Sequence, residues 1–186
     1  MNINDMKKRI YSILDIPALA DESAVLAAID SAARKIALYT KCIKKYKKIA
    51  FMKENGVFAA TLPEDFASFC YIRRGVRVYG RERFEIVSGK IKSTALCGEC
   101  ELIYFAYPPE ACKAESDEVI IFSDDYMSDA AVYGAAMELC GSIRPGDIQR
   151  YMRIATEYDE RMANMISGAC ANIANAFFNG MRGVFN

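Results

Sequence analysis

Apolar residues recur at intervals of three and four along the N-terminal part of the chain, the pattern of helices with one buried side. Residues 4–15 are predicted to form a short amphipathic helix that stops before Pro17, because proline cannot continue a helix. A longer helix is predicted from about residue 22 to residue 52, with Asp21 or Ser23 as its N-cap. Its apolar or neutral positions follow a heptad spacing, which predicts packing against other helices: Leu26, Ile29, Ala33, Ile36, Thr40 and Ile43.

The pattern then changes to short runs rich in Val, Ile, Phe, Tyr and Thr, the residue types favoured in strands. Turn signals at Ser88-Gly89 and Cys97-Gly98-Glu99 predict an antiparallel meander, in which neighbours in the sequence are neighbours in the sheet. Pro108-Pro109 is expected to stop the last strand. The predicted strands cover residues 57–62, 68–79, 83–88, 90–96 and 101–107.

The helical period returns after an acidic loop at residues 111–118. Ser123 is expected to cap a third helix over residues 124–140, whose Ala and Gly residues allow another helix to approach closely. Pro145 is expected to open a fourth helix. Its predicted apolar stripe again has heptad spacing: Ile148, Tyr151, Ala155, Tyr158, Met162, Met165, Ala169 and Ile173.

Together these patterns predict a mostly helical α+β fold: a bundle of long helices with an inserted antiparallel β meander. With 186 residues the chain is expected to form a single domain, which buries roughly 70% of its unfolded surface. The expected parts are a helical body, a β insertion and a C-terminal tail. The body covers about residues 4–54 and 123–178, the insertion about residues 57–122, and the tail residues 179–186.

Composition removes most catalytic chemistry. Histidine is absent, so Ser–His and Cys–His nucleophile pairs, histidine general bases and histidine metal ligands are excluded. No glycine-rich phosphate loop with Gly-Lys-Ser or Gly-Lys-Thr occurs. The seven cysteines are scattered and odd in number, as is typical of reduced, buried thiols in a cytosolic protein. The chain is therefore expected not to be an enzyme and to use no catalytic residue, cofactor or small-molecule substrate.

Two clusters have the residue types of a metal site. Cys97 and Cys100 could share a Zn²⁺ or form a small disulfide ring, but the pair lacks further ligands, and a hairpin turn is the favoured interpretation. Acidic residues near the start of the third helix could bind a hard cation, but their spacing matches no calcium loop and a helix start favours acids anyway. The acidic residues are Asp117, Glu118, Asp124, Asp125 and Asp129. No metal is predicted.

Charge is balanced over the whole chain and uneven along it. Residues 1–56 carry 11 basic and 6 acidic side chains, whereas residues 110–186 carry 6 and 12. This asymmetry either orients head-to-tail contacts between identical subunits or reflects differently solvated faces. The lysines at the end of the predicted second helix are a candidate DNA-facing surface, or alternatively a solvated helix end that complements the helix dipole. They are Lys41, Lys44, Lys45, Lys47 and Lys48.

The chain also lacks the signals of a membrane or secreted protein. No apolar run approaches the roughly 20 residues that a membrane-spanning helix needs. The polar residues 1–9 are not followed by the hydrophobic region of a signal peptide. A cytosolic location without membrane contact is expected.

Several motifs occur in order between residues 20 and 165. Leu62-Pro63-Glu64-Asp65-Phe66 opens the strand region, Tyr104-Phe105-Ala106-Tyr107-Pro108-Pro109 closes it, and Tyr133-Gly134-Ala135-Ala136 lies in the third helix. Long helices stand at both ends. This order resembles the head-tail connector (adaptor) proteins of tailed bacteriophages.

The resemblance implies a structural, non-enzymatic protein that forms a ring beneath the portal, extends the DNA channel and presents a surface to the tail. Its partners would be further copies of the chain, the portal and tail proteins, with non-specific DNA contact. It would occupy the host cytoplasm during assembly and then the virion. The C-terminal residues would dock on a neighbour or the portal: Phe177, Phe178, Met181, Arg182 and Phe185.

A different class of function uses the same residues. A cytosolic helical module that binds protein or nucleic acid, unrelated to virions, would present the lysine-rich segment in the same way. Portal, capsid and tail genes beside the coding sequence would favour the connector.

Overall fold

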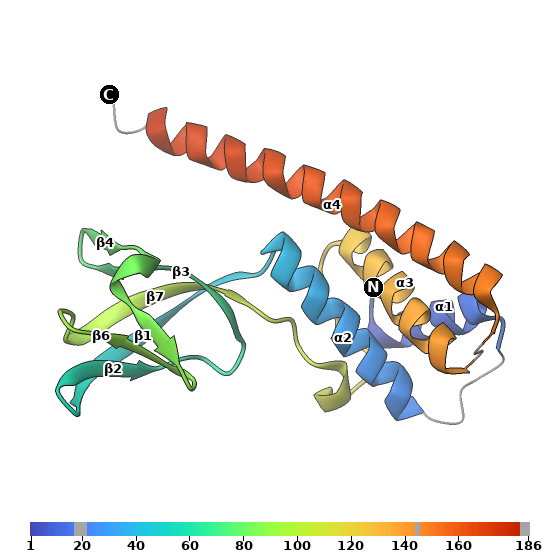
Figure 1. Cartoon of the computed structure of the whole chain (residues 1–186), viewed down its shortest axis with the longest axis horizontal. Coiled ribbons are helices and arrows are strands. Elements are labelled where there is room, and N and C mark those ends of the chain that lie inside the picture. Colours follow the sequence, from blue (N-terminus) through green and yellow to red (C-terminus); the bar gives the residue numbers. More distant parts are fainter. Residues whose placement is uncertain (17–21, 144–145, 183–186) are drawn as a thin grey trace. The chain divides into compact units, whose positions relative to one another are not determined.

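The computed structural model describes residues 1–16, 22–143 and 146–182, with side chains up to residue 166. The chain divides into two compact units (Figure 1). The helical unit consists of Met1–Thr40 and Pro108–Asn186, and the β unit is Lys41–Tyr107. The described structure is 47% helical and 29% strand, so the predicted bundle with a small inserted meander is wrong. The β unit has a core of its own.

Four α-helices are described in the helical unit: α1 (Ile3–Leu14), α2 (Glu22–Thr40), α3 (Asp125–Ile143) and α4 (Ile148–Arg182). The positions of α1 and α3 confirm the prediction to within a few residues. Each start has a side-chain cap: Asn2 Oδ1 accepts from the amide of Asp5 at 2.8 Å, and Asp124 Oδ1 from that of Tyr126 at 2.8 Å. Asp124 thus takes the role expected of Ser123. The predicted opening at Pro145 lies outside the described residues.

The second helix ends at Thr40, twelve residues before its predicted end at residue 52. Lys41 has a φ of +50°, a left-handed conformation that terminates a helix. The segment beyond it carries lysines at 41, 44, 45, 47 and 48, and a helix would bring several of them together at spacings of three and four. In a strand, successive side chains alternate between the two faces, which separates these charges. The residues form strand β1 (Lys44–Glu54) instead.

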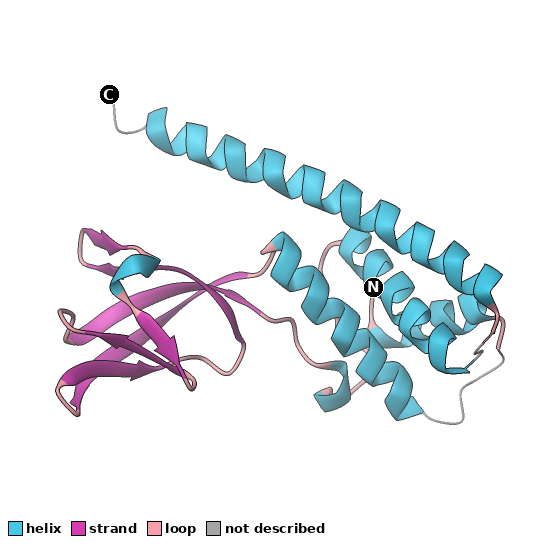
Figure 2. Ribbon diagram, in the orientation of Figure 1, coloured by secondary structure: helices cyan, strands magenta, loops and turns pink. Residues whose placement is uncertain are grey.

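Seven strands of the described chain form an antiparallel half-barrel sheet in the order β4-β3-β7-β1-β2-β6-β5 (Figure 2). The first part of β1 pairs with β7, and its last residues pair with β2, so β1 belongs to both halves of the sheet. The other strands are β2 (Val57–Thr61), β3 (Phe66–Arg74), β4 (Arg77–Tyr79), β5 (Glu85–Val87), β6 (Lys90–Ser93) and β7 (Gly98–Ala106).

The sheet is not the predicted meander. The hairpin at Ser88-Gly89 is confirmed, since β5 pairs with β6. At Cys97-Gly98-Glu99 the prediction is wrong, because β6 pairs with β2 and β5 whereas β7 lies between β1 and β3. Asn55-Gly56, which follows the predicted end of the second helix, forms the β1–β2 turn, with φ of +48° and +86°. Asn-Gly between strands is a strong hairpin signal because both turn residues take positive φ.

The core of the helical unit depends on small residues of α3, which contacts α1, α2 and α4. Ala130, Ala131, Ala135 and Ala136 are fully buried. A Cβ atom at Gly134 would lie 3.0 Å from Ala32 Cβ on α2 and 3.0 Å from Tyr158 Cε2 on α4. Glycine therefore allows both neighbours to approach α3 at one level of the helix.

The predicted stripe on α4 is displaced. Ile148 is 71% exposed, whereas Ile154, outside the stripe, is 1% exposed. Tyr158 and Met162 do contribute to the buried side, being half-buried and 9% exposed. A straight α-helix repeats every 3.6 residues, so a stripe drawn with a heptad period drifts away from the buried side.

Lys7 connects three parts of the helical unit that are distant in sequence. This side chain of α1 is almost fully buried and donates to Glu22, the first residue of α2, at 2.5 Å, and also to Asp117. Burial disfavours the lysine cation, but the hydrogen bonds to both carboxylates outweigh it and raise the pKa of Lys7. The ion pairs join α1 to the start of α2 and to the segment before α3.

Substitution of Gly134 by leucine is expected to lower the free energy of unfolding by about 1–3 kcal/mol, because the side chain overpacks the contact with Ala32 and Tyr158. Urea or thermal unfolding of the full chain measures the change. Gly141→Leu is the matched control in the same helix, since a Cβ atom at Gly141 would have no neighbour within 4 Å. It is expected to change stability by less than about 1 kcal/mol. Equal losses in the two variants would contradict the close packing at Gly134.

Candidate functional site

The five lysines predicted to face DNA lie at the start of the β unit, where they point to two sides of the sheet. The inner face is the side on which Ile49, Phe51 and Leu102 fill the core, and the outer face is the opposite side. Lys45 and Lys47 pair in register with Tyr104 and Leu102 and share the inner side of β1. The outer side carries Lys44 and Lys48, and Lys41 lies over the outer ring of Phe105. A single five-lysine surface is therefore not formed.

On the inner side, Lys45 is part of a polar network around Asp65. Lys45 Nζ donates to Asp65 Oδ2 at 2.7 Å, and the hydroxyl of Tyr104 donates to Asp65 Oδ1 at 2.9 Å. The Asp65 carbonyl accepts from the amide of Tyr107 at 2.7 Å, and the ring of Phe66 stacks on that of Tyr104 with 5.9 Å between centroids. Asp65 thus binds the end of β7 through both its side chain and its backbone.

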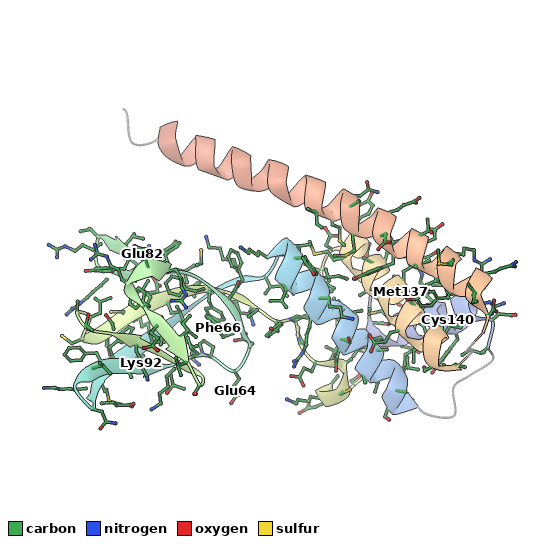
Figure 3. All side chains as sticks on the ribbon, in the orientation of Figure 1. Glu64, Phe66, Glu82, Lys92, Met137 and Cys140 are labelled. Carbon is green, nitrogen blue, oxygen red and sulfur yellow. The ribbon has the colours of Figure 1, made fainter. Side chains whose placement is uncertain are left out.

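This network joins the two motifs that flank the strand region. Leu62–Phe66 form the turn into β3, in which Glu64 is exposed at the bend (Figure 3). Residues 104–106 end β7, and Tyr107 follows the strand. The two segments are about 40 residues apart in sequence and meet through Asp65, Phe66, Tyr104 and Tyr107. The polar residues of both motifs therefore have a structural role in closing the β unit.

The network also changes proton affinities. Burial raises the pKa of the Asp65 carboxyl, but the hydrogen bonds from Lys45 and Tyr104 outweigh it and hold the value below 3.8. Burial, together with the bond to Asp65, raises the pKa of Tyr104 to about 12. Asp65 is therefore ionised and Tyr104 neutral at physiological pH, the states that the network needs.

Asp65→Ala is expected to lower the free energy of unfolding by about 1–3 kcal/mol at neutral pH, because two donors lose their acceptor. Since Asp65 has a lowered pKa in the folded state, its contribution is present above pH 3.8 and is lost as the pH falls through the folded value. Urea unfolding of the wild type and of Asp65→Ala, from neutral pH to below pH 3.8, measures the difference in unfolding free energy.

Tyr104→Phe is the companion variant, because it removes the hydroxyl and keeps the ring stacked on Phe66. Its expected cost is smaller, about 1 kcal/mol. If the difference in unfolding free energy between wild type and Asp65→Ala stays constant as the pH falls below 3.8, the role of the ionised carboxylate is contradicted.

On the outer face, aromatic and cationic side chains alternate across three adjacent strands. Lys44 Nζ lies 5.5 Å from the ring centroid of Tyr71, and Lys41 Nζ lies 5.8 Å from that of Phe105. Tyr46 is 77% exposed. We call this surface the cationic sheet face; it consists of Lys41, Lys44, Tyr46, Lys48, Tyr71, Arg73 and Phe105.

Net charge follows the division into units. The β unit carries 13 Lys and Arg residues against 7 Asp and Glu, a net charge of +6. The remaining residues carry 11 against 17, a net charge of −6. The asymmetry along the sequence is thus sharper in the structure, since the boundary at Lys41 assigns the whole lysine-rich segment to the β unit. The β unit is the part of the chain suited to a polyanion.

The Cys97–Cys100 pair has no metal-site geometry. Cys97 is exposed in the segment that leads into β7, whereas Cys100 is buried on the inner face beside Ile49. Burial raises the pKa of the Cys100 thiol, which disfavours the thiolate that a metal or a redox reaction needs. Within residues 1–16, 22–143 and 146–182, no group of three cysteine, aspartate or glutamate side chains could hold a metal ion.

Three of the five acidic residues considered for a cation are used in ion pairs, Asp124 caps α3, and Glu118 accepts from the side-chain amide of Asn2. Asp117 binds Lys7, Asp125 lies 3.4 Å from the N-terminal ammonium of Met1, and Asp129 binds Arg9 and Arg161. Arg161 also lies 3.8 Å from the ring centroid of Tyr133. An open depression of about 550 Å³ at this place is lined by Met1, Asp5, Arg9, Asp125, Tyr126 and Asp129. Asp125 and Asp129 are paired there with the Met1 ammonium, Arg9 and Arg161, which indicates a structural role.

The proposed docking residues belong to the end of α4. Phe177, Phe178, Met181 and Arg182 lie within this helix, but their side chains, like the whole of Phe185, are outside the described residues. With 35 residues α4 is about 52 Å long, while α2 and α3 have 19 residues and are about 28 Å long. Part of α4 therefore extends past its neighbours in the helical unit (Figure 1).

Comparison of the chain with protein-family models and with curated proteins finds no match. None of the helices in the described residues has the length and apolar character to cross a membrane.

Sequence reasoning misses the aromatic part of the cationic sheet face. The heptad pattern places Tyr46 at the flank of a helix, and so in a helical core. A contrary signal is present in the alternation Lys44, Tyr46, Lys48, which has the period of two of a strand, followed by Asn55-Gly56. Tyr71 and Phe105 carry no such local signal, because only the pairing of β3 and β7 brings them to the same face.

Proposed function

We propose that this protein is a subunit of a phage head-tail connector, which joins the portal ring to the tail and extends the DNA channel. The observation that supports it most is the contact between two of the motifs on which the resemblance depends. Asp65 of the first motif binds Tyr104 and Tyr107 of the second, so the two motifs form one structural element. Because the two motifs are in contact in the fold, they support the resemblance together and not as two unrelated short matches.

The two units have the properties of an assembling subunit. Their net charges of +6 and −6 are complementary, so the β unit of one copy can attract the helical unit of the next. Such a head-to-tail contact is heterologous and closes into a ring when the rotation between copies allows it. In this role the chain acts in the host cytoplasm during assembly and then in the virion, without catalysis, cofactor or small-molecule substrate.

The end of α4 is the proposed contact with the portal or with a neighbouring copy. The helix is long enough for its last turns to lie beyond α2 and α3. The sequence there supplies Phe177, Phe178 and Met181, large apolar residues of the kind that anchor protein interfaces. An amphipathic helix that enters a groove of a partner is a common recognition mode.

Reconstitution with the portal ring encoded in the same genome tests the connector role. We expect electron microscopy of the mixture to show a second ring attached to the portal, and native mass spectrometry to show several copies bound to it. A protein that is monomeric when isolated is compatible with this result, since the portal serves as the template. Failure of the full chain to bind the portal ring, with and without tail proteins, would refute the proposal.

Removal of residues 177–186 tests the docking segment within that assay. We expect the shortened chain to keep its far-UV circular dichroism apart from the lost turns, and to lose attachment to the portal. Lys47→Gln serves as a control with an exposed change in the β unit and is expected to attach normally. If the shortened chain attaches normally to the portal, the contact with the portal must be made by another surface of the chain.

A nucleic-acid-binding module unrelated to virions is the second candidate, favoured by the cationic sheet face. The position of the gene separates the two, because a connector gene lies among portal, capsid and tail genes. If the gene lies away from such genes and the protein does not bind a portal ring, the protein would be assigned to this second class.

A further inference from the structure

The outer face of the β unit has charges that the fold does not need. The core of this unit lies on the inner face, so Lys44 and Lys48 contribute little to burial. Both are exposed. They lie on one side of β1 with Tyr46 between them, and Lys41 lies on the same side. Arg73 on β3 donates from its Nε to Glu101 at 2.7 Å and offsets the charge of that carboxylate, so the positive charge of this face comes from the three lysines. Three lysines on one face of a unit with net charge +6 favour a polyanionic ligand.

Aromatic rings alternate with these charges in a regular arrangement. The strand register aligns Tyr71, Ile103 and Tyr46 in one row across β3, β7 and β1. The adjacent rows contain Phe105 beside Lys44 and Glu101 beside Lys48. Rows on one face of a strand are about 7 Å apart. The rings and the cations therefore occupy neighbouring rows of one surface.

Tyr46 is the most available of these rings. Its side chain is 77% exposed, although Ile103, its partner in the row, is 6% exposed. Tyr71 and Phe105 are partly buried, each with a lysine amine above the ring. The exposed ring of Tyr46 lies between Lys44 and Lys48 on the outer side of β1, so one ligand can reach a ring face and two cations.

We infer that the cationic sheet face binds single-stranded nucleic acid. Bases stack on Tyr46, with Tyr71 and Phe105 as further platforms, while Lys41, Lys44 and Lys48 contact the phosphates. Aromatic side chains on a sheet with a cationic groove are the recurrent way in which proteins hold single strands without sequence preference. A duplex encloses the faces of its bases, so the rings favour the single strand over the duplex.

A second copy of the chain is the other polyanionic surface that could cover this face, since the helical unit carries a net charge of −6. Lysines alone would serve that contact. The rings distinguish the two occupants, because stacking on flat bases uses an exposed tyrosine more fully than contact with carboxylates does. The combination of rings and lysines therefore favours nucleic acid.

This inference does not rest on attachment to the portal, although the proposed contact between copies also uses the charge of the β unit. It concerns one surface of the β unit in the full chain and needs no portal. Attachment to the portal is proposed for a different part of the chain, the end of α4. Failure of single-strand binding would leave the reconstitution result unchanged. Failure of reconstitution would leave the binding result unchanged.

Fluorescence anisotropy of a labelled oligothymidylate of about 16 nucleotides, titrated with the full chain, tests the inference. We expect saturable binding that is tighter for the single strand than for a duplex of the same length. The logarithm of the binding constant should fall with the logarithm of salt concentration with a slope of about −2, as for three lysine–phosphate contacts.

Substitutions separate stacking from charge. Tyr46→Ala is expected to weaken binding at least fivefold, roughly the loss of one base stack, and Tyr46→Phe to restore it. Lys48→Gln is expected to reduce the magnitude of the salt slope by about 0.7. Lys47→Gln is the matched control, because this adjacent lysine lies on the inner side, and its slope should equal that of the wild type. Tyr46 and Lys48 are exposed, so thermal unfolding of these variants should match that of the wild type.

Three results would overturn the inference. The first is equal affinity for single strand and duplex, with Tyr46→Ala unchanged, which would assign the face to phosphates only. The second is the same loss in Lys47→Gln as in Lys48→Gln, which would mean that the surface does not follow the outer face. The third is absence of binding together with self-association that Lys48→Gln abolishes, which would assign the face to the helical unit of a second copy.

Discussion

The ladder between β1 and β7 runs from Lys44, opposite Phe105, to Phe51, opposite Gly98, and the other features of the β unit depend on it. Because side chains alternate along a strand, this one register sends Ile49 and Phe51 into the core and Lys44, Tyr46 and Lys48 to the outer face. A slip by one residue would exchange the two sets, burying lysines and exposing the core. The hydrophobic free energy of the core therefore also determines where the cations and the exposed ring lie.

Asp65 closes the same unit at the end of the ladder where Lys44 lies opposite Phe105. Its carboxylate accepts from Lys45 and Tyr104, and its carbonyl accepts from Tyr107, so the turn before β3 is held against the end of β7. The inner side of the sheet thus uses Lys45 for closure, whereas the lysines of the outer side are those assigned to the proposed ligand. Adjacent lysines in one strand have different roles because the sheet has two faces.

The helical unit is organised by a different constraint, which is the close approach of helices at Gly134. Many of its charged residues form ion pairs that stabilise the unit, such as Lys7 with Asp117 and Arg161 with Asp129. Among the described residues they form no cluster suited to a metal. The acidic excess of this unit and the basic excess of the β unit are the general electrostatic features that the proposed assembly uses. A ring of such subunits would alternate the two charges.

Local patterns in the sequence determined much of the helical unit. The three-and-four spacing in α1 and the small residues of α3 are properties of contiguous residues, and the absence of histidine restricts the chemistry without any structure. Tertiary structure decided whether residues 41–54 form a helix or a strand. The apolar positions from Leu26 to Ile43 continue a helical period, but the residues that follow pair with β7 and form a strand. It also decided the position of β7 between β1 and β3, and hence the meeting of Tyr46, Tyr71 and Phe105. Such contacts join residues far apart in the chain, and the free energy that selects them comes from burying a common core, which no local pattern contains.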